Sequence, residues 1–208
     1  MKIKICGMKF PKNILEIGAL QPDYMGFIFY PKSKRFVGEN FLNKSIGNLP
    51  KSIKKTGVFV NESVAIILDK VTKYNLDAVQ LHGNESVAEC NILKDKNIKI
   101  IKAFSIDASF DFEILKPYEA VCDYFLFDTK TPAYGGSGKT FDWQLLDNYK
   151  LEKPFFLSGG LNSHNIGKLN FDAYPMLRGL DFNSQLENDD FSKNKLKTQE
   201  IIQKIRTQ

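Results

Sequence analysis

Short apolar runs recur along the whole chain and are separated by more polar segments. Eight of them are rich in β-branched and aromatic residues and are apolar at nearly every position: residues 3–6, 26–30, 56–60, 78–82, 98–104, 124–129, 155–159 and 176–182. Strands in which apolar and polar residues do not alternate are typical of a parallel sheet, because both faces of such a sheet are covered. The pattern therefore predicts eight buried parallel strands.

The segments between these runs carry helical patterns of varying clarity. In residues 63–75, apolar side chains from Val64 onward fall on one face at helical spacing, and Ser63 or Asn61 can supply the N-cap. The expected helices cover residues 11–20, 38–49, 63–75, 84–95 and 192–206, whereas the stretch 105–123 is irregular and its helix is short or distorted.

The order of strand and helix repeats eight times, which predicts a single-domain α/β fold, a closed (β/α)₈ TIM barrel covering residues 1–208. A doubly wound open sheet is the alternative. The barrel is preferred because the count is eight and no glycine fingerprint follows the first strand.

Composition agrees with an ordinary globular chain. Hydrophobic residues make up 43% of the 208 residues and charged residues 25%. No apolar run approaches the roughly 18 residues of a membrane span, and the N-terminus lacks the longer apolar stretch of a signal peptide. We therefore expect a cytoplasmic protein without a membrane partner.

The net charge of +5 comes from scattered lysines rather than from a concentrated basic face. Nucleic-acid binding is therefore not expected, whereas a small anionic substrate fits a mild basic excess. The three cysteines are widely spaced and form no CxxC pair, and only His82 and His164 are present. Neither a disulfide framework nor a metal site is expected.

Candidate chemistry collects where the strands end, and in a barrel of this type the active site lies at the carboxyl ends of the strands. Each residue there has an ordinary structural explanation, such as a buried thiol or a capping carboxylate, but all of them fall at the same end. They are Cys6, Arg35, His82, Asp128, Ser158, Gly159, Gly160, Asp181, Asn183 and Ser184.

The first and sixth strands are not neighbours in an eight-stranded ring. Cys6 and Asp128 are therefore expected to face a small molecule from different sides, which suits a reaction that removes one proton and adds another. Glycine-rich loops offer backbone N–H groups to a phosphate, at Gly136, Ser137 and Gly138 and again at Gly159 and Gly160. The segment after Asp181 is expected to begin a short extra helix beside them.

Several motifs together resemble the phosphoribosylanthranilate isomerase family: KICG (4–7), GFIFYPKSKR (26–35), GVFVN (57–61), VQLHG (79–83), FDTKTPAYGGSGKTFDW (127–143) and FLSGGL (156–161). The resemblance implies a (β/α)₈ enzyme without metal or cofactor that carries out an Amadori rearrangement in tryptophan biosynthesis. It implies Cys6 as general base, Asp128 as general acid and Arg35 as the ligand of the anthranilate carboxylate. Both a monomer and a homodimer are compatible with it.

Two expectations follow from this resemblance. A thiol that acts as a base needs a pKa shifted toward the thiolate, aided by a nearby cation. The last motif of the family usually reads Asp-x-Ser-Ser-Gly-Val-Glu, whereas residues 181–187 read DFNSQLE. Because Gln185 stands where glycine is usual, the phosphate contacts of that loop are expected to be weaker or differently arranged.

Three other functions remain as alternatives. A pentose-phosphate epimerase usually needs metal-binding histidines and acids, and an indole-glycerol-phosphate synthase relies on catalytic lysine and glutamate at strand ends. A non-catalytic phosphate-binding barrel tolerates changes at Cys6 and Asp128 but not in the glycine loops.

Overall fold

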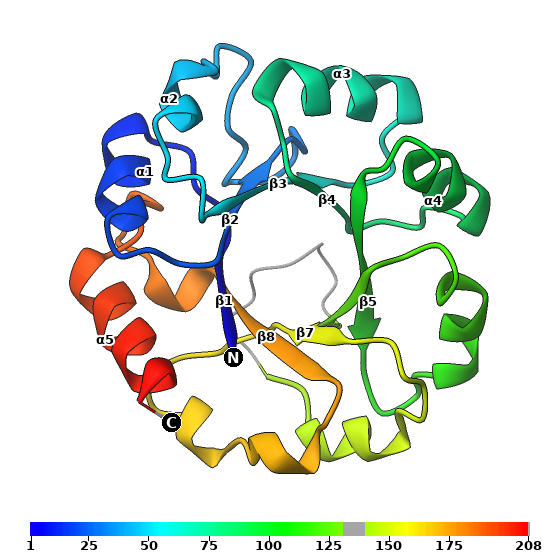
Figure 1. The fold of residues 1–208 in the computed structure, drawn as a ribbon. Helices are drawn as coiled ribbons and strands as arrows, with labels where there is room; N and C mark the ends of the chain where they lie inside the picture. Colours follow the sequence, from blue (N-terminus) through cyan, green and yellow to red (C-terminus); the bar gives the residue numbers. More distant parts are fainter. Residues whose placement is uncertain (131–139, 208) are drawn as a thin grey trace.

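Eight parallel strands close into one barrel in chain order (Figure 1). The structure is a computed structural model that describes residues 1–130 and 140–207. The strands are β1 (Lys2–Ile5), β2 (Tyr24–Ile28), β3 (Lys54–Phe59), β4 (Ala78–Leu81), β5 (Lys99–Ile106), β6 (Tyr124–Thr129), β7 (Phe155–Leu157) and β8 (Leu177–Phe182). Because β1 pairs with both β2 and β8, the predicted closed barrel is confirmed and the open sheet is excluded.

Helices surround the ring of strands (Figure 1). The α-helices are α1 (Pro11–Gly18), α2 (Lys44–Gly47), α3 (Val64–Tyr74), α4 (Val87–Lys94) and α5 (Lys195–Arg206). The 3₁₀-helices are η1 (Phe112–Tyr118), η2 (Trp143–Asn148), η3 (Ile166–Lys168), η4 (Phe171–Ala173) and η5 (Ser184–Leu186). Throughout the described residues, every helix falls short of the length and hydrophobicity needed to span a membrane.

Two helix predictions need correction. The segment 38–49 is helical only in α2, because glycine and asparagine at several of its positions are weak helix formers. Its Phe41 instead packs against the rings of Phe27 and Phe29. The strict alternation of strand and helix also fails after β6 and β7, where the described residues form 3₁₀ turns rather than α-helices. The irregular stretch 105–123 is confirmed, and η1 contains Pro117.

The clearest helices begin where the sequence offers a cap. The Ser63 hydroxyl accepts a hydrogen bond from the backbone N–H of Ile66 and begins α3, so Ser63 rather than Asn61 is the N-cap. Ser86 and Glu89 form a capping box at the start of α4. These local signals explain why both helices were predictable from sequence.

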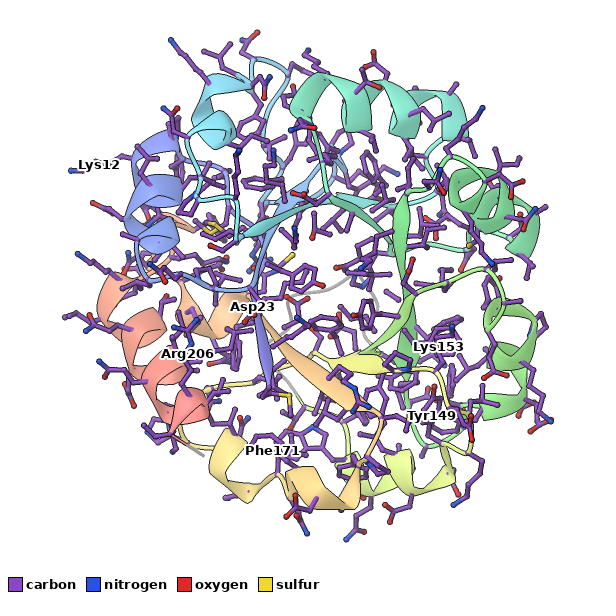
Figure 2. All side chains as sticks on the ribbon, in the orientation of Figure 1. Lys12, Asp23, Tyr149, Lys153, Phe171 and Arg206 are labelled. Atoms are coloured by element: carbon purple, nitrogen blue, oxygen red, sulfur yellow. The ribbon has the colours of Figure 1, made fainter. Side chains whose placement is uncertain are left out.

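Inside the ring of strands, Tyr24, Ile101, Ala103, Leu126 and Phe156 form one apolar cluster, and Figure 2 shows side chains filling the ring. The rings of Tyr24 and Phe156 lie 5.4 Å apart. They come from β2 and β7, which are not neighbours, so both point inward. Gly179 makes room for them, since a Cβ there would lie 2.3 Å from the Phe156 ring. This cluster fills part of the barrel interior with side chains.

Candidate active site

Residues at the carboxyl ends of the strands line a cavity. Its wall combines apolar side chains such as Ile28 and Val58 with polar groups, as small-molecule sites do. Ten of the thirteen candidate residues named from sequence line it: Cys6, Arg35, His82, Asp128, Ser158, Gly159, Gly160, Asp181, Asn183 and Ser184. The other three, Gly136, Ser137 and Gly138, lie outside the described residues.

Cys6 follows the last residue of β1, and its side chain reaches over β2. Gly26 provides the space, because a Cβ there would lie 2.6 Å from Cys6 Sγ. The backbone N–H of Cys6 donates to the carbonyl oxygen of Phe182 at 2.8 Å, which holds this end of β1 against β8. The thiol therefore sits in the cavity wall, and Cys6 is only 4% exposed.

Lys4 also points into the barrel, because side chains two positions apart on a strand share a face. Its Nζ lies 3.0 and 2.9 Å from the two carboxylate oxygens of Asp181, and both side chains are buried. Sequence reasoning placed Asp181 in the site but missed Lys4. The signal was present, since Lys4 precedes the candidate cysteine by two positions in the same strand.

The charges around Cys6 do not produce the expected shift toward the thiolate. Burial raises the pKa of Cys6 above its ordinary value, although Lys4 and Lys193 act in the opposite direction. The expectation of a lowered thiol pKa is therefore wrong, because burial outweighs both lysines. Burial also opposes the charge on Lys4, but Asp181 and Cys6 outweigh it and raise the pKa of the amine, so Lys4 stays protonated.

Asp128 lies near the end of β6, which β7 and β8 separate from β1 in the ring. Its Oδ1 accepts a hydrogen bond from the backbone N–H of Thr129 at 2.9 Å, and its Oδ2 lies 3.4 Å from His82 Nε2. At the other nitrogen of the imidazole, Gln80 Nε2 lies 2.7 Å from His82 Nδ1. Gln80 and Asp128 therefore contact opposite nitrogens of the His82 imidazole. Gln80 was not predicted.

The loop after β7 brings the backbone of Gly159 close to Asp128. Gly159 and Gly160 have positive φ angles of 91° and 62°. A Cβ on Gly159 would lie 2.2 Å from Thr129 Oγ1 and 3.0 Å from Asp128 Oδ1. The carbonyl oxygen of Gly160 accepts hydrogen bonds from the side chains of two asparagines farther along the loop, at 3.2 and 2.9 Å. This loop is therefore fixed next to the carboxyl group.

The loop after β8 contains η5, so the expected short extra helix is confirmed. Asn183, Ser184 and Gln185 all line the cavity. Gln185 is not among the described residues with positive φ, so its backbone conformation does not call for the usual glycine.

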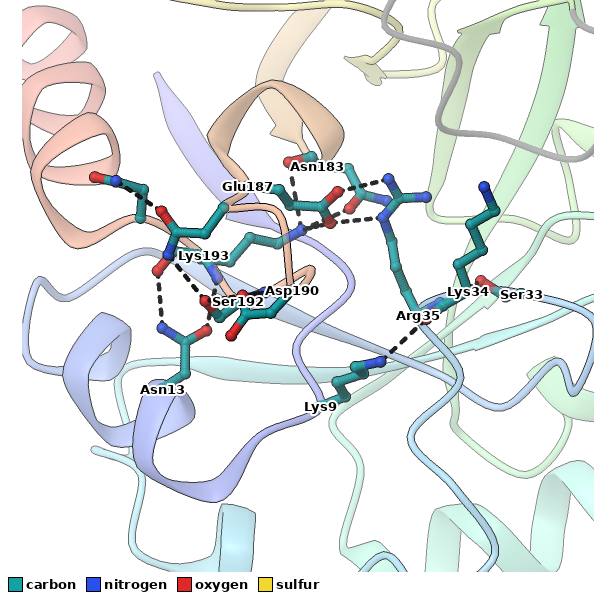
Figure 3. A network of polar contacts seen from close by, with 12 residues as sticks. Lys9, Asn13, Ser33, Lys34, Arg35, Asn183, Glu187, Asp190, Ser192 and Lys193 are labelled. Atoms are coloured by element: carbon teal, nitrogen blue, oxygen red, sulfur yellow. Dashed lines mark hydrogen bonds and ion pairs between the residues drawn. The ribbon is translucent and has the colours of Figure 1, made fainter.

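Arg35 enters the cavity wall from the loop after β2, where it meets a carboxylate of the protein itself (Figure 3). Its Nε and Nη2 each lie 2.6 Å from the Glu187 carboxylate. The Nζ of Lys193 lies 2.6 Å from the same carboxylate and 2.7 Å from Asn183 Oδ1. The motif at residues 181–187 contains Glu187, but the sequence predicted no role for this residue or for Lys193.

Among the described residues, no group of three or more His, Cys, Asp and Glu side chains is arranged to hold a metal ion. The wall of the cavity instead presents a thiol, carboxyl groups, an imidazole and a guanidinium to a small molecule. A closed parallel barrel with such a cavity at the carboxyl ends of its strands defines the class of (β/α)₈-barrel enzymes.

The chain belongs to the N-(5'phosphoribosyl)anthranilate isomerase family, whose model matches residues 3–204. An N-(5'-phosphoribosyl)anthranilate isomerase from Parabacteroides distasonis is 44% identical over 206 residues, which cover 99% of this chain and 93% of the relative. This result confirms the resemblance seen in the motifs. It also decides against the epimerase and synthase families.

Solved structures agree with this family. A structure of monomers generated from the dimeric phosphoribosylanthranilate isomerase of Thermotoga maritima matches this chain with a TM-score of 0.83 at 31% identity. The match covers 100% of both chains. A phosphoribosylanthranilate isomerase in complex with reduced 1-(o-carboxyphenylamino)-1-deoxyribulose 5-phosphate matches with a TM-score of 0.83 at 30% identity, again over 100% of both chains.

Proposed function

We propose that this chain converts N-(5-phosphoribosyl)anthranilate to 1-(2-carboxyphenylamino)-1-deoxyribulose 5-phosphate, with Cys6 as base and Asp128 as acid. The observation that carries the assignment of these roles is that both side chains line one cavity from β1 and β6. A pentose held between them presents its ring oxygen to one group and its C2′–H bond to the other. Family membership supplies the substrate class.

The reaction begins when Asp128 gives its proton to the furanose ring oxygen. The bond between that oxygen and C1′ breaks, and the nitrogen lone pair forms an iminium at C1′. The Cys6 thiolate then removes the proton from C2′, which gives an enolamine that tautomerises to the ketone. One proton is delivered and one is removed, so the isomerisation is balanced and needs no redox cofactor.

The raised pKa of Cys6 is compatible with this role because the reaction itself changes the local charge. Ring opening creates a positive iminium beside the thiol, in addition to Lys4 and Lys193. An opposite charge at close range favours the ionised form of an acid. The thiolate is therefore favoured most when the C2′ proton is to be transferred.

The remaining cavity residues bind the two anionic ends of the substrate. The planar fork of Arg35 suits the anthranilate carboxylate, because it can donate to two oxygens at once. The loops at 159–160 and 183–184 bind the phosphate, as loops after the seventh and eighth strands commonly do in this fold. His82, whose Nε2 lies 3.4 Å from Asp128 Oδ2, holds the carboxyl group toward the sugar.

A fluorescence assay tests these roles, since the anthranilate emission of the substrate falls as product forms. We expect Cys6→Ala and Asp128→Asn each to lower kcat by about 10²- to 10⁴-fold, the usual contribution of a general acid or base. Binding of the reduced product should be retained in both variants, which separates an enzyme from a non-catalytic phosphate-binding barrel. Turnover of Cys6→Ala at the parental rate would refute the mechanism.

A further inference from the structure

The segment that follows β8 encloses the side chain of Arg35 on two sides. The Glu187 carboxylate accepts hydrogen bonds from Nε and Nη2, both at 2.6 Å (Figure 3). The ring of Phe191 lies 5.8 Å from the guanidinium carbon, within the range of a cation–π contact. One edge of the guanidinium is thus held by Glu187, and the ring of Phe191 from the same segment lies close to it.

This segment is itself held firmly. Glu187 and Lys193 form an isolated antiparallel bridge, and the backbone N–H of Asn188 donates to the carbonyl oxygen of Ser192 at 2.9 Å. The side chain of Asn13 in α1 binds both the N–H and the carbonyl oxygen of Lys193, each at 2.8 Å. The position of Glu187 is therefore set by the fold rather than by the presence of Arg35.

Phe191 adopts a backbone conformation that a bulky residue rarely takes, with φ at 67°. Such strain persists only where the surrounding structure imposes it, and it concentrates at functional sites. Here the conformation places an aromatic ring near three cations: the ring also lies 5.6 Å from Lys9 Nζ and 6.0 Å from Lys34 Nζ.

Glu187 balances two positive charges at once. Burial lowers the pKa of Lys193 to about 8, and the nearby charge of Arg35 adds to this shift, although Glu187 acts in the opposite direction. When Lys193 is protonated, the trio of Arg35, Lys193 and Glu187 carries one net positive charge. A single added carboxylate would neutralise it.

The geometry of arginine leaves room for that carboxylate. A guanidinium carries five N–H donors along two usable edges. Glu187 takes the edge formed by Nε and Nη2, which leaves the edge formed by Nη1 and Nη2. Among the described residues, Arg35 lines the cavity and Glu187 does not, so Glu187 stands behind Arg35 rather than against a ligand.

We propose that Glu187, assisted by the ring of Phe191, is a positioning residue that holds Arg35 so that its free edge recognises the carboxylate of the aryl group. This inference rests on the proposed function and deepens it. It assigns the preference for an aryl group with an ortho-carboxylate to a pair of residues that do not touch the substrate.

The test compares two ligands by titration calorimetry: reduced 1-(o-carboxyphenylamino)-1-deoxyribulose 5-phosphate and the same compound without its carboxyl group. For Glu187→Gln, we expect Kd of the carboxylated ligand to rise at least about tenfold, or 1.4 kcal/mol. Kd of the ligand without the carboxyl group should stay within about twofold, because the phosphate and sugar contacts are intact. In turnover, KM should rise more than kcat falls, as for lost ground-state binding.

Two further variants make the result decisive. Phe191→Leu removes the ring face and keeps apolar bulk, so it should weaken only the carboxylated ligand and carries the test if Glu187→Gln does not fold. Glu113→Gln removes an exposed partner of Lys116 and should leave both affinities unchanged.

Three results would overturn the inference. The first is an equal rise of both Kd values in Glu187→Gln, and the second is no change in either. The third is tighter binding of the carboxylated ligand, which would make Glu187 a competitor for Arg35. If the parent protein binds neither ligand, the proposed function itself fails.

Discussion

Replacing Lys4 with methionine removes one half of a buried ion pair in the barrel. The ammonium lies 2.9 and 3.0 Å from the oxygens of Asp181. At an effective dielectric constant of about 20, unit charges at this distance attract by about 6 kcal/mol, and the burial of Lys4 offsets part of that. Removing one partner of such a pair costs about 3–5 kcal/mol. We expect Lys4→Met to lose that much free energy of unfolding at pH 8.

The size of this loss should depend on pH. Burial raises the pKa of Asp181, and without Lys4 nothing comparable opposes it. A carboxyl group with a higher pKa in the folded than in the unfolded protein binds more protons when folded. Its contribution to the free energy of unfolding therefore falls as pH rises from about 3.9 through the folded value. The deficit of Lys4→Met should be larger at pH 8 than at pH 5.

Urea denaturation followed by the fluorescence of Trp143 measures both effects. The double variant Lys4→Met/Asp181→Leu removes both charges and should recover most of the loss, because no unpaired charge stays buried. Lys116→Met is the surface control, since its pair with Glu113 is exposed and screened by solvent. A Lys4→Met deficit below about 1 kcal/mol at pH 8, or an equal deficit at both pH values, would refute this reasoning.

Three more outcomes follow from the geometry. Gly26→Ala places a methyl group 2.6 Å from Cys6 Sγ and should displace the thiol. We expect kcat to fall at least about tenfold while the protein still unfolds cooperatively. An unchanged kcat would contradict the close contact between residue 26 and Cys6. Gly159→Ala strains a backbone with φ of 91° and crowds Asp128, so it should lose about 1–3 kcal/mol of unfolding free energy, measured in urea. Burial raises the pKa of Cys6, so the thiolate absorbance present in the parent but not in Cys6→Ser should appear in a pH titration above the ordinary thiol pKa of about 8.5. A titration midpoint below that pH would contradict the prediction.

The strands were predictable because their signal is local and strong. All eight were found to within two residues at either end, since a strand buried on both faces is apolar throughout. The helices were less predictable where tertiary contacts override weak local preferences. Phe41 illustrates this, because it lies outside α2 and its ring packs against that of Phe29.

The site was predictable in its position but not in its electrostatics. Topology brings the carboxyl ends of the strands together, so residues next to those ends were found. Lys4 and Gln80 were missed because they lie within strands and act through the inward face. The contact of Arg35 with Glu187 joins residues 152 positions apart, a relation that no local pattern contains.

The ion pairs around Cys6 explain why a thiol among cations remains protonated. Lys4 is paired with Asp181, and Lys193 shares Glu187 with Arg35, so a carboxylate lies against each ammonium near the thiol. The net field at Cys6 is therefore weaker than two lysines alone would give, and burial decides the pKa. In the proposed mechanism, the iminium adds a positive charge at C1′, next to the C2′–H bond from which Cys6 takes the proton, while the carboxylate left by the proton transfer lies on Asp128 at β6. The proposed site would therefore ionise its base mainly in response to the reaction and keep the thiol in its less reactive form at other times.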